Sequence, residues 1–262
     1  MSARNDYKHG TFCWVDLMTP DPEGAKAFYG ELFGWTHDDQ PTDMGPPYTL
    51  FKLGSMRVAG MSALPPDMQK AGMPPVWNSY IRVTNADDVA AKVVALGGKV
   101  RMPVMQVMNE GRMAFLADRE GASFGIWEPN EHRGADLVNE PGAFCWNELY
   151  TRDLDTAKAF YGDLFGWTFE TSPGATGPYT SFKNGDTDNG GMLPITAEMG
   201  DMPPNWGVYL AVADHDVSSL RAKELGGRIV TDAMDVPDVG RFSVLTDPAG
   251  ASFVIIELDR PA

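Results

Sequence analysis

The sequence has little of several features that would reveal its chemistry directly. Cysteine occurs twice and histidine four times in 262 residues, and there is no Cys/His cluster, glycine-rich phosphate loop or Gly-x-Ser-x-Gly turn. These absences argue against zinc-finger, phosphate-ester and serine-hydrolase functions. No apolar run approaches the roughly 20 residues that span a bilayer, and the N-terminal segment is polar, so we expect a cytoplasmic protein.

Basic residues are also scarce. The chain has 21 Lys and Arg against 36 Asp and Glu, which gives a formal net charge of −15. The resulting negative potential repels phosphate backbones and anionic lipid headgroups, so we expect neither nucleic acid nor a membrane as partner. Cys13 and Cys145 are expected to be buried, unreactive thiols, because the cytosol is reducing.

What the sequence does have is an internal duplication. The segment from Phe12 to Trp35 recurs as Phe144 to Trp167, and downstream landmarks keep nearly the same spacing of about 130 residues. This predicts one module over residues 9–129, a polar connector over 130–141 and a second module over 142–259. Each copy can give the other the sheet-edge contact that a dimer would supply, so we expect a monomer or a weak homodimer.

Within each copy the pattern predicts a strand, a helix and further strands, and then the same series again. In the first copy a short strand over 14–18 precedes a helix that Asp21 caps, that has Pro22 at its first position and that Gly34 ends. A second strand and helix follow at 81–83 and 87–96, and again at 208–212 and 216–225. Hairpins close both copies. Hairpin turns and four helices per chain favour an α+β fold of mixed curved sheets with helices on one face.

At these residues the sequence resembles the vicinal-oxygen-chelate superfamily of glyoxalases, bleomycin-resistance proteins and extradiol dioxygenases. The resemblance rests on the Asp21…Phe28-Tyr29…Leu32…Gly34 pattern, its repetition and the Asp-x-x-Gly turn before each last strand. It implies two tandem glyoxalase-like modules, each a pair of βαβββ units that form a cupped mixed sheet with helices outside. More narrowly, the chain is similar to tandem actinobacterial members labelled as hydroxylases or mycobacterial antigens, and such labels define no chemistry.

The resemblance also implies where a metal would be held, and the residues there differ from the family pattern. The first-strand ligand position falls on Trp14 and Trp146, and neither indole can coordinate a cation. The other two ligand positions fall near Asn78 and Gly207 and on Gly125 and Val254, which are poor or impossible donors to a transition metal. We therefore predict no metal site and no cofactor. The alternative is a divalent metal held unconventionally by Asp16 or Glu148.

Strand alternation indicates which residues line the two cups. On the first strand Trp14, Asp16 and Met18 share one face, and the repeat gives Trp146, Glu148 and Tyr150. A carboxylate among apolar side chains has its pKa raised by desolvation, which suits Asp16 and Glu148 to act as a general base or as a ligand anchor. The alternative is that both are tied to Arg112, Arg241 or backbone N–H groups as ordinary buried ion pairs.

The sequence therefore leaves three functional hypotheses open, and one of them is an interaction protein whose pockets are vestigial. The first is a small-molecule-binding protein without a metal, whose ligand is apolar or aromatic; the second is a lyase or oxygenase of the glyoxalase or dioxygenase type that uses Asp16 and Glu148. Methionines such as Met102 and Met105 would suit an irregular ligand or simply fill the core. The Trp and Tyr residues after the Pro-rich loops could form pocket walls or core between the copies. The expected ligand-binding residues are Trp14, Met18, Asn78, Tyr80, Arg112, Trp146, Tyr150, Trp206, Tyr209 and Arg241.

Overall fold

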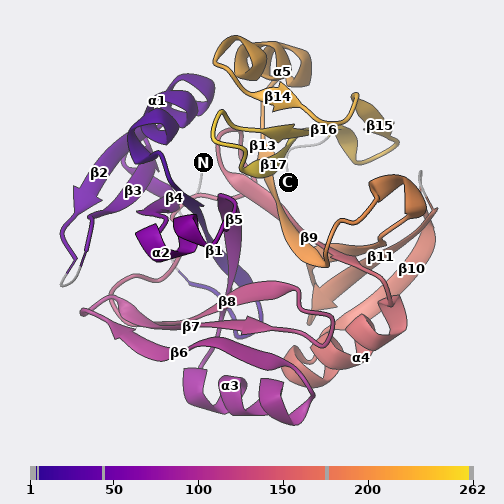
Figure 1. The fold of residues 1–262 in the computed structure, drawn as a ribbon. Helices are drawn as coiled ribbons and strands as arrows, with labels where there is room; N and C mark the ends of the chain where they lie inside the picture. Colours follow the sequence, from indigo (N-terminus) through magenta and orange to yellow (C-terminus); the bar gives the residue numbers. More distant parts are fainter. Residues whose placement is uncertain (1–3, 5, 43–44, 175–176, 260–262) are drawn as a thin grey trace.

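The chain forms two mixed β-sheets, one for each copy of the repeat (Figure 1). The computed structural model describes residue 4 and residues 6–42, 45–174 and 177–259. The first sheet has the strand order β2-β3-β4-β1-β5-β8-β7-β6, and the second has β10-β11-β12-β9-β13-β17-β16-β14, with β15 paired to β16. The fold is thus α+β with two tandem glyoxalase-type modules, as the sequence predicts.

Each sheet is assembled in the same way from its two halves. In the first copy β1 pairs in parallel with β4 and antiparallel with β5, and β5 pairs in parallel with β8. The elements are β1 (Phe12–Thr19), α1 (Pro22–Phe33), β2 (Thr36–Gln40), β3 (Tyr48–Leu53), β4 (Met56–Ala63), α2 (Pro66–Lys70), β5 (Val76–Arg82), α3 (Ala86–Ala95), β6 (Lys99–Val107), β7 (Gly111–Ala117) and β8 (Ser123–Pro129).

The second copy repeats this order with small changes at its later edge. One long strand of the first copy, β6, is replaced by two short ones, β14 and β15. The elements are β9 (Phe144–Thr151), α4 (Leu154–Phe165), β10 (Thr168–Gly174), β11 (Gly177–Asn184), β12 (Thr187–Pro194), the 3-10 turn η1 (Ala197–Met199), β13 (Asn205–Ala211), α5 (His215–Glu224), β14 (Arg228–Ile229), β15 (Met234–Val236), β16 (Gly240–Thr246) and β17 (Ser252–Leu258).

Local sequence sets the ends of the long helices. Asp21 accepts a hydrogen bond from the backbone N–H of Gly24 at the start of α1, and Gly34 ends the helix with a left-handed φ of 71°. Asp153 and Gly166 do the same for α4. The short helix α2 was not predicted, because its residues are all exposed and leave no apolar periodicity to detect. It makes five α-helices in the described residues instead of four, and it includes Met68.

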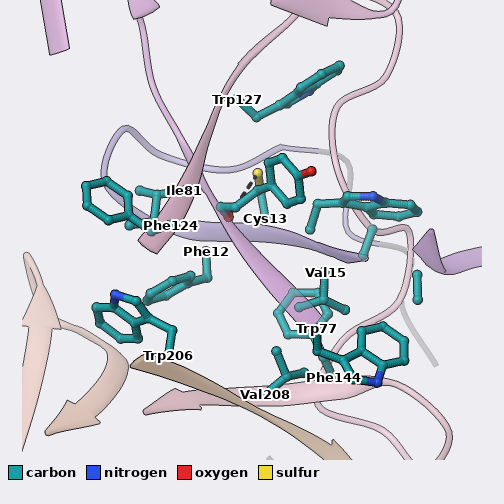
Figure 2. Close-up of a cluster of buried hydrophobic side chains, with 14 of the residues drawn as sticks. Phe12, Cys13, Val15, Trp77, Ile81, Phe124, Trp127, Phe144, Trp206 and Val208 are labelled. Atoms are coloured by element: carbon teal, nitrogen blue, oxygen red, sulfur yellow. Dashed lines mark hydrogen bonds between the residues drawn. The ribbon is translucent and has the colours of Figure 1, made fainter. Parts of the chain in front are cut away.

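Most of the main core lies between the outer, helix-covered faces of the two sheets. Figure 2 shows Val15 and Trp77 of the first copy in one cluster with Phe144 and Val208 of the second. A bulge in β1 between Phe12 and Trp14 breaks the alternation, so that Phe12 joins this core and packs on Trp206 at 5.1 Å.

The two copies therefore meet through their outer faces and helices. The hydrogen-bonded ladders of the described strands each stay within one copy, so the expected contact between sheet edges is wrong. Helix α1 of the first copy lies against α5 of the second, and α3 lies against α4 (Figure 1). None of the helices in the described ranges is long and apolar enough to cross a membrane.

Candidate functional site

The candidate site is the inner face of each sheet, which we define as the face turned away from the helices. In the first copy the β-ladders place Asp16 opposite Asn78 on β5 and Gly60 on β4, and place Trp14 opposite Tyr80. Antiparallel cross-strand neighbours point to the same side of a sheet, so these side chains converge on one floor.

Asp16 is the centre of the first floor. Its Oδ1 accepts a hydrogen bond from Asn78 Nδ2 at 2.9 Å, and its Oδ2 accepts from Tyr80 Oη at 2.9 Å and Tyr48 Oη at 3.2 Å. Tyr48 Oη in turn accepts from Trp14 Nε1 at 2.9 Å. Asp16 is 4% exposed, and burial raises the pKa of its carboxyl against the opposing effect of these hydrogen bonds. The ion pair with Arg112 does not form.

Glu148 holds the same place in the second floor. Tyr209 donates to its Oε1 at 2.6 Å, and the hydroxyls of Tyr179 and Tyr150 act on the carboxyl to lower its pKa. Trp146 Nε1 donates to Tyr179 Oη at 3.0 Å, as Trp14 does to its own tyrosine. Burial raises the pKa of the Glu148 carboxyl as well. Both copies thus present an indole that donates to a tyrosine hydroxyl and a buried acid that accepts from a tyrosine, and in the first copy these bonds form one continuous chain.

The two floors differ by one compensating exchange. Asn78, which donates to the acid of the first copy, corresponds to Gly207 in the second, opposite Glu148. Met18, which reaches no acid, corresponds to Tyr150. A Cβ at Gly207 would lie 3.1 Å from the Tyr150 ring, so the glycine leaves the space through which that ring reaches the acid. The copies thus satisfy the acid with different donors.

Glycine at three floor positions is required by the tyrosines. A Cβ at Gly60 would overlap the Tyr48 hydroxyl, and a Cβ at Gly191 would overlap the Tyr179 hydroxyl. At Gly125, the expected last-strand ligand position, a Cβ would overlap the Tyr80 ring. A carboxylate side chain therefore cannot occupy this position unless the tyrosine that hydrogen-bonds Asp16 moves.

The residues of the floors do not fit the metal that the fold family implies. A transition-metal site needs several imidazole, carboxylate or thiolate donors with free lone pairs. Each floor has one carboxylate, its oxygens already accept hydrogen bonds, and its indole occupies the first-strand ligand position. Over the described ranges no three His, Cys, Asp or Glu side chains are grouped to hold an ion.

The structure brings together most of the expected ligand-binding residues but not three of them. Arg112 lies on the outer face, paired with Asp87 on α3 and with Glu128, and Arg241 pairs with Asp216 and Asp235. The prediction that these two arginines line the cups was wrong. Each is one residue away from a side chain that points to the inner face, so strand alternation turns it to the outer face. Trp206 is likewise on the outer face, where it belongs to the core between copies. The expected residues on the inner faces are Trp14, Met18, Asn78, Tyr80, Trp146, Tyr150 and Tyr209.

Sequence reasoning missed three residues at the floors. Tyr48 and Tyr179 were visible only as landmarks of the repeat, which do not show that their hydroxyls reach the acids. His132, in the connector, packs its ring on Trp14 with centroids 4.5 Å apart. No periodicity marks this contact, because it joins segments more than a hundred residues apart.

The fold, the duplicated floor and the helix pattern agree with the comparisons to known proteins. Residues 11–126 match the Glyoxalase/Bleomycin resistance protein/Dioxygenase superfamily, and residues 144–256 match a Glyoxalase-like domain. Together with the relatives below, these matches show that the chain belongs to this superfamily.

Particular relatives are similar along nearly their whole length. "Putative glyoxylase CFP32" of Mycobacterium tuberculosis is 43% identical and covers 98% of both chains. "Anthracycline biosynthesis protein DnrV" of Streptomyces peucetius is 34% identical over 95% of this chain and 94% of its own. The Mn(II)-bound glyoxalase from Novosphingobium aromaticivorans shares the fold, with a TM-score of 0.63 at 16% identity over 97% of this chain and 86% of its own.

Proposed function

We propose that this protein binds a small, largely apolar or aromatic molecule on an inner face of its sheets, without a metal centre. The observation that carries the proposal is present in both copies: an indole donates to a tyrosine hydroxyl, and the neighbouring buried acid accepts a hydrogen bond from a tyrosine. It occupies the place of the metal with groups that satisfy one another, and it leaves aromatic rings as the surface that a ligand would contact.

The size of the hydrophobic effect makes such a site sufficient without a metal. A flat ligand that buries roughly 300 Å² of apolar surface gains about 7.5 kcal/mol, from which several kcal/mol of association cost are subtracted. Aromatic walls alone would bind weakly. One or two hydrogen bonds from floor tyrosines would bring the affinity to the micromolar range. The name of the Streptomyces relative, an anthracycline biosynthesis protein, supports an aromatic ligand.

The enzymatic alternative is less well supported by the floor geometry. A general base has to come within hydrogen-bond reach of the proton that it removes. Asp16 and Glu148 are 4% and 3% exposed and already accept bonds from tyrosines. Burial also raises the pKa of Tyr80 and Tyr209 well above 10, so their hydroxyls are poor acids. These groups suit a fixed polar floor better than proton transfer.

A titration with and without chelator tests the proposal. Purified protein treated with EDTA is titrated with an uncharged dihydroxyanthraquinone, and binding is followed by calorimetry and by tryptophan fluorescence. We expect a micromolar dissociation constant that is unchanged by chelation or by added Mn²⁺. Binding that disappears with EDTA and returns with Mn²⁺ would disprove the metal-free site, and absence of binding to this probe and to related polycyclic aromatics would contradict the proposed function.

A further inference from the structure

The two inner faces differ in how much of them is covered. In the first copy the connector between modules packs across the end of β1, where Ala135 N donates to Cys13 O at 2.8 Å. The ring of His132 lies edge to face with Trp14, and its backbone oxygen accepts a hydrogen bond from Trp127 Nε1 at 2.7 Å. Trp14 is consequently only 4% exposed.

The connector is fixed in this position by an ion pair. Arg57 on β4 contacts Asp136 with its Nε and Nη2, at 2.8 and 2.9 Å, and places Nη1 3.2 Å from His132 Nδ1. An arginine can only donate, so Nδ1 accepts and the proton of neutral His132 is on Nε2. That Nε2 has no hydrogen-bonding partner and lies in a ring packed between Trp14 and Trp127. We call this packing of His132 between Trp14 and Trp127 the plug. It is a closed aromatic contact rather than a ligand site.

The second inner face has an apolar wall that is left partly open. Tyr209, Val254 and Ile256 form a cluster separate from the main core. Partly exposed side chains surround the cluster, and with it they make up what we call the second wall: Cys145, Trp146, Phe242, Val244 and Leu258. By contrast, Trp14, Tyr80 and Trp127, their counterparts on the first inner face, belong to the main core.

A hollow of about 270 Å³ lies at the end of the second wall, where Leu258 lines it together with Ala211 and Ala213. Its other lining residues are Val212, Glu257 and, from the connector, Asn139 and Pro141. The strand register identifies the residues of the first copy that correspond to this lining. Ala211 corresponds to Arg82, one residue beyond the pairs Phe12–Ile81 and Phe144–Leu210. The Arg82 side chain reaches Thr84, the counterpart of Ala213, at 2.9 Å. Small residues in the second copy thus stand where longer ones fill the space in the first.

We propose that the ligand site is the second wall alone, and that it takes one uncharged planar aromatic molecule with a hydrogen-bonding group on one edge. This rests on the proposed function. Trp146 and Phe242 provide the aromatic contact, and the partly exposed Tyr150 and Tyr179 provide the hydroxyls at the floor. The chain has a net charge of −15, so an anionic ligand is disfavoured. The first inner face is a plugged, structural copy.

Calorimetric titration with the uncharged dihydroxyanthraquinone tests the assignment without any variant, because it counts sites. We expect one molecule per chain. An anthraquinone sulfonate, which adds a negative charge to the same rings, is expected to bind at least tenfold more weakly. Two equivalent sites per chain would overturn the assignment to one wall, and equal affinity for the sulfonate would overturn the uncharged ligand class.

Matched variants then locate the site. Phe242 pairs with Ile256 in the second copy, and Met113 pairs with Trp127 in the first. Phe242 and Met113 therefore hold equivalent positions, and both side chains are partly exposed. Phe242→Glu is expected to weaken binding at least tenfold, and Met113→Glu to change it less than twofold, with folding of both checked by thermal melting. The opposite pattern would place the ligand in the first copy. Failure of wild type to bind any aromatic probe would instead contradict the proposed function itself.

Discussion

The hydroxyl of Tyr29 in the first copy donates a hydrogen bond to Asp247 Oδ2 in the second, at 3.1 Å, and Tyr161 repeats this contact with Asp118 at 3.1 Å. Each tyrosine is fully buried on a helix and also accepts a bond from an indole, as Tyr29 does from Trp77 at 2.9 Å. The acids cap the turns before the last strands. The duplication therefore produces two equivalent locks between the copies, each built from a helix of one copy and a turn of the other.

Breaking one lock is expected to destabilise the whole chain. Tyr29→Phe keeps the ring but leaves the Trp77 N–H and one Asp247 oxygen without this partner in a buried site, which costs about 1–3 kcal/mol. Urea unfolding measures the loss, and Tyr161→Phe serves as the matched variant with a similar effect. A loss below about 0.5 kcal/mol in both variants would show that the locks add little to the copy interface.

The exchange between the two floors predicts a coupling between Asn78 and Met18. Asn78→Gly removes a donor from the buried Asp16 carboxylate and is expected to cost about 1–3 kcal/mol. Adding Met18→Tyr supplies a hydroxyl in the arrangement of the second copy, so the double variant should recover about 1 kcal/mol relative to additive losses. Denaturation of the four proteins in this cycle gives the coupling. Strict additivity would contradict the compensation.

Stability should depend on pH through His132. Burial and the neighbouring Arg57 lower the pKa of its imidazole from 6.5 to about 4, while Asp136 opposes the shift. Between these values the unfolded chain holds more protons than the folded one, so the free energy of unfolding falls as pH falls from 6.5 to 4, by at most about 3 kcal/mol from this group.

The variant His132→Gln isolates this contribution, because its amide oxygen can still accept from Arg57 but does not titrate. The raised pKa values of Asp16 and Glu148 act in the opposite direction, since the folded state takes up their protons first as pH falls. Both proteins keep these acids, so their effect cancels in the comparison. Unfolding curves of the two proteins should diverge below pH 6.5, and parallel pH profiles would contradict a buried neutral imidazole.

Both thiols are expected to be unreactive in the folded protein. Cys13 and Cys145 are free, and burial raises the pKa of the Cys145 thiol to about 12 and that of Cys13 further. At pH 8 roughly one Cys145 thiol in ten thousand would be ionised. A thiol reagent should therefore label the native protein slowly, at Cys145 first because Cys13 is fully buried, and both quickly in urea. Rapid native labelling of Cys13 would disprove its buried position.

Much of the fold followed from local signals. Asp21, Pro22 and Gly34 mark both ends of α1 by capping chemistry, and the second copy provides an independent repeat of the same pattern. Strand alternation also placed Trp14, Asp16 and Met18 on one face. The same alternation puts Arg112, Arg241 and Trp206 on the outer face, although their residue types suit a ligand site.

The partners of the acids could not be predicted from the sequence. The sequence allows Asp16 to pair with Arg112, but in the structure its partners are Tyr48, Tyr80 and Asn78. These residues come from two other strands, and only the ladder register sets which hydroxyl reaches the carboxylate. Alternation shows which face a side chain takes, whereas the distance between two side chains depends on how strands align.

The sequence by itself determined the duplication, the helix ends and the residue types that replace metal ligands, because capping, periodicity and donor chemistry are properties of a residue and its near neighbours. The tertiary structure alone decided that the connector covers Trp14 and leaves Trp146 partly exposed. It also decided how the two copies lock together. These features arise where segments far apart in the chain pack against each other, and nearly identical local sequences in the two copies cannot distinguish them.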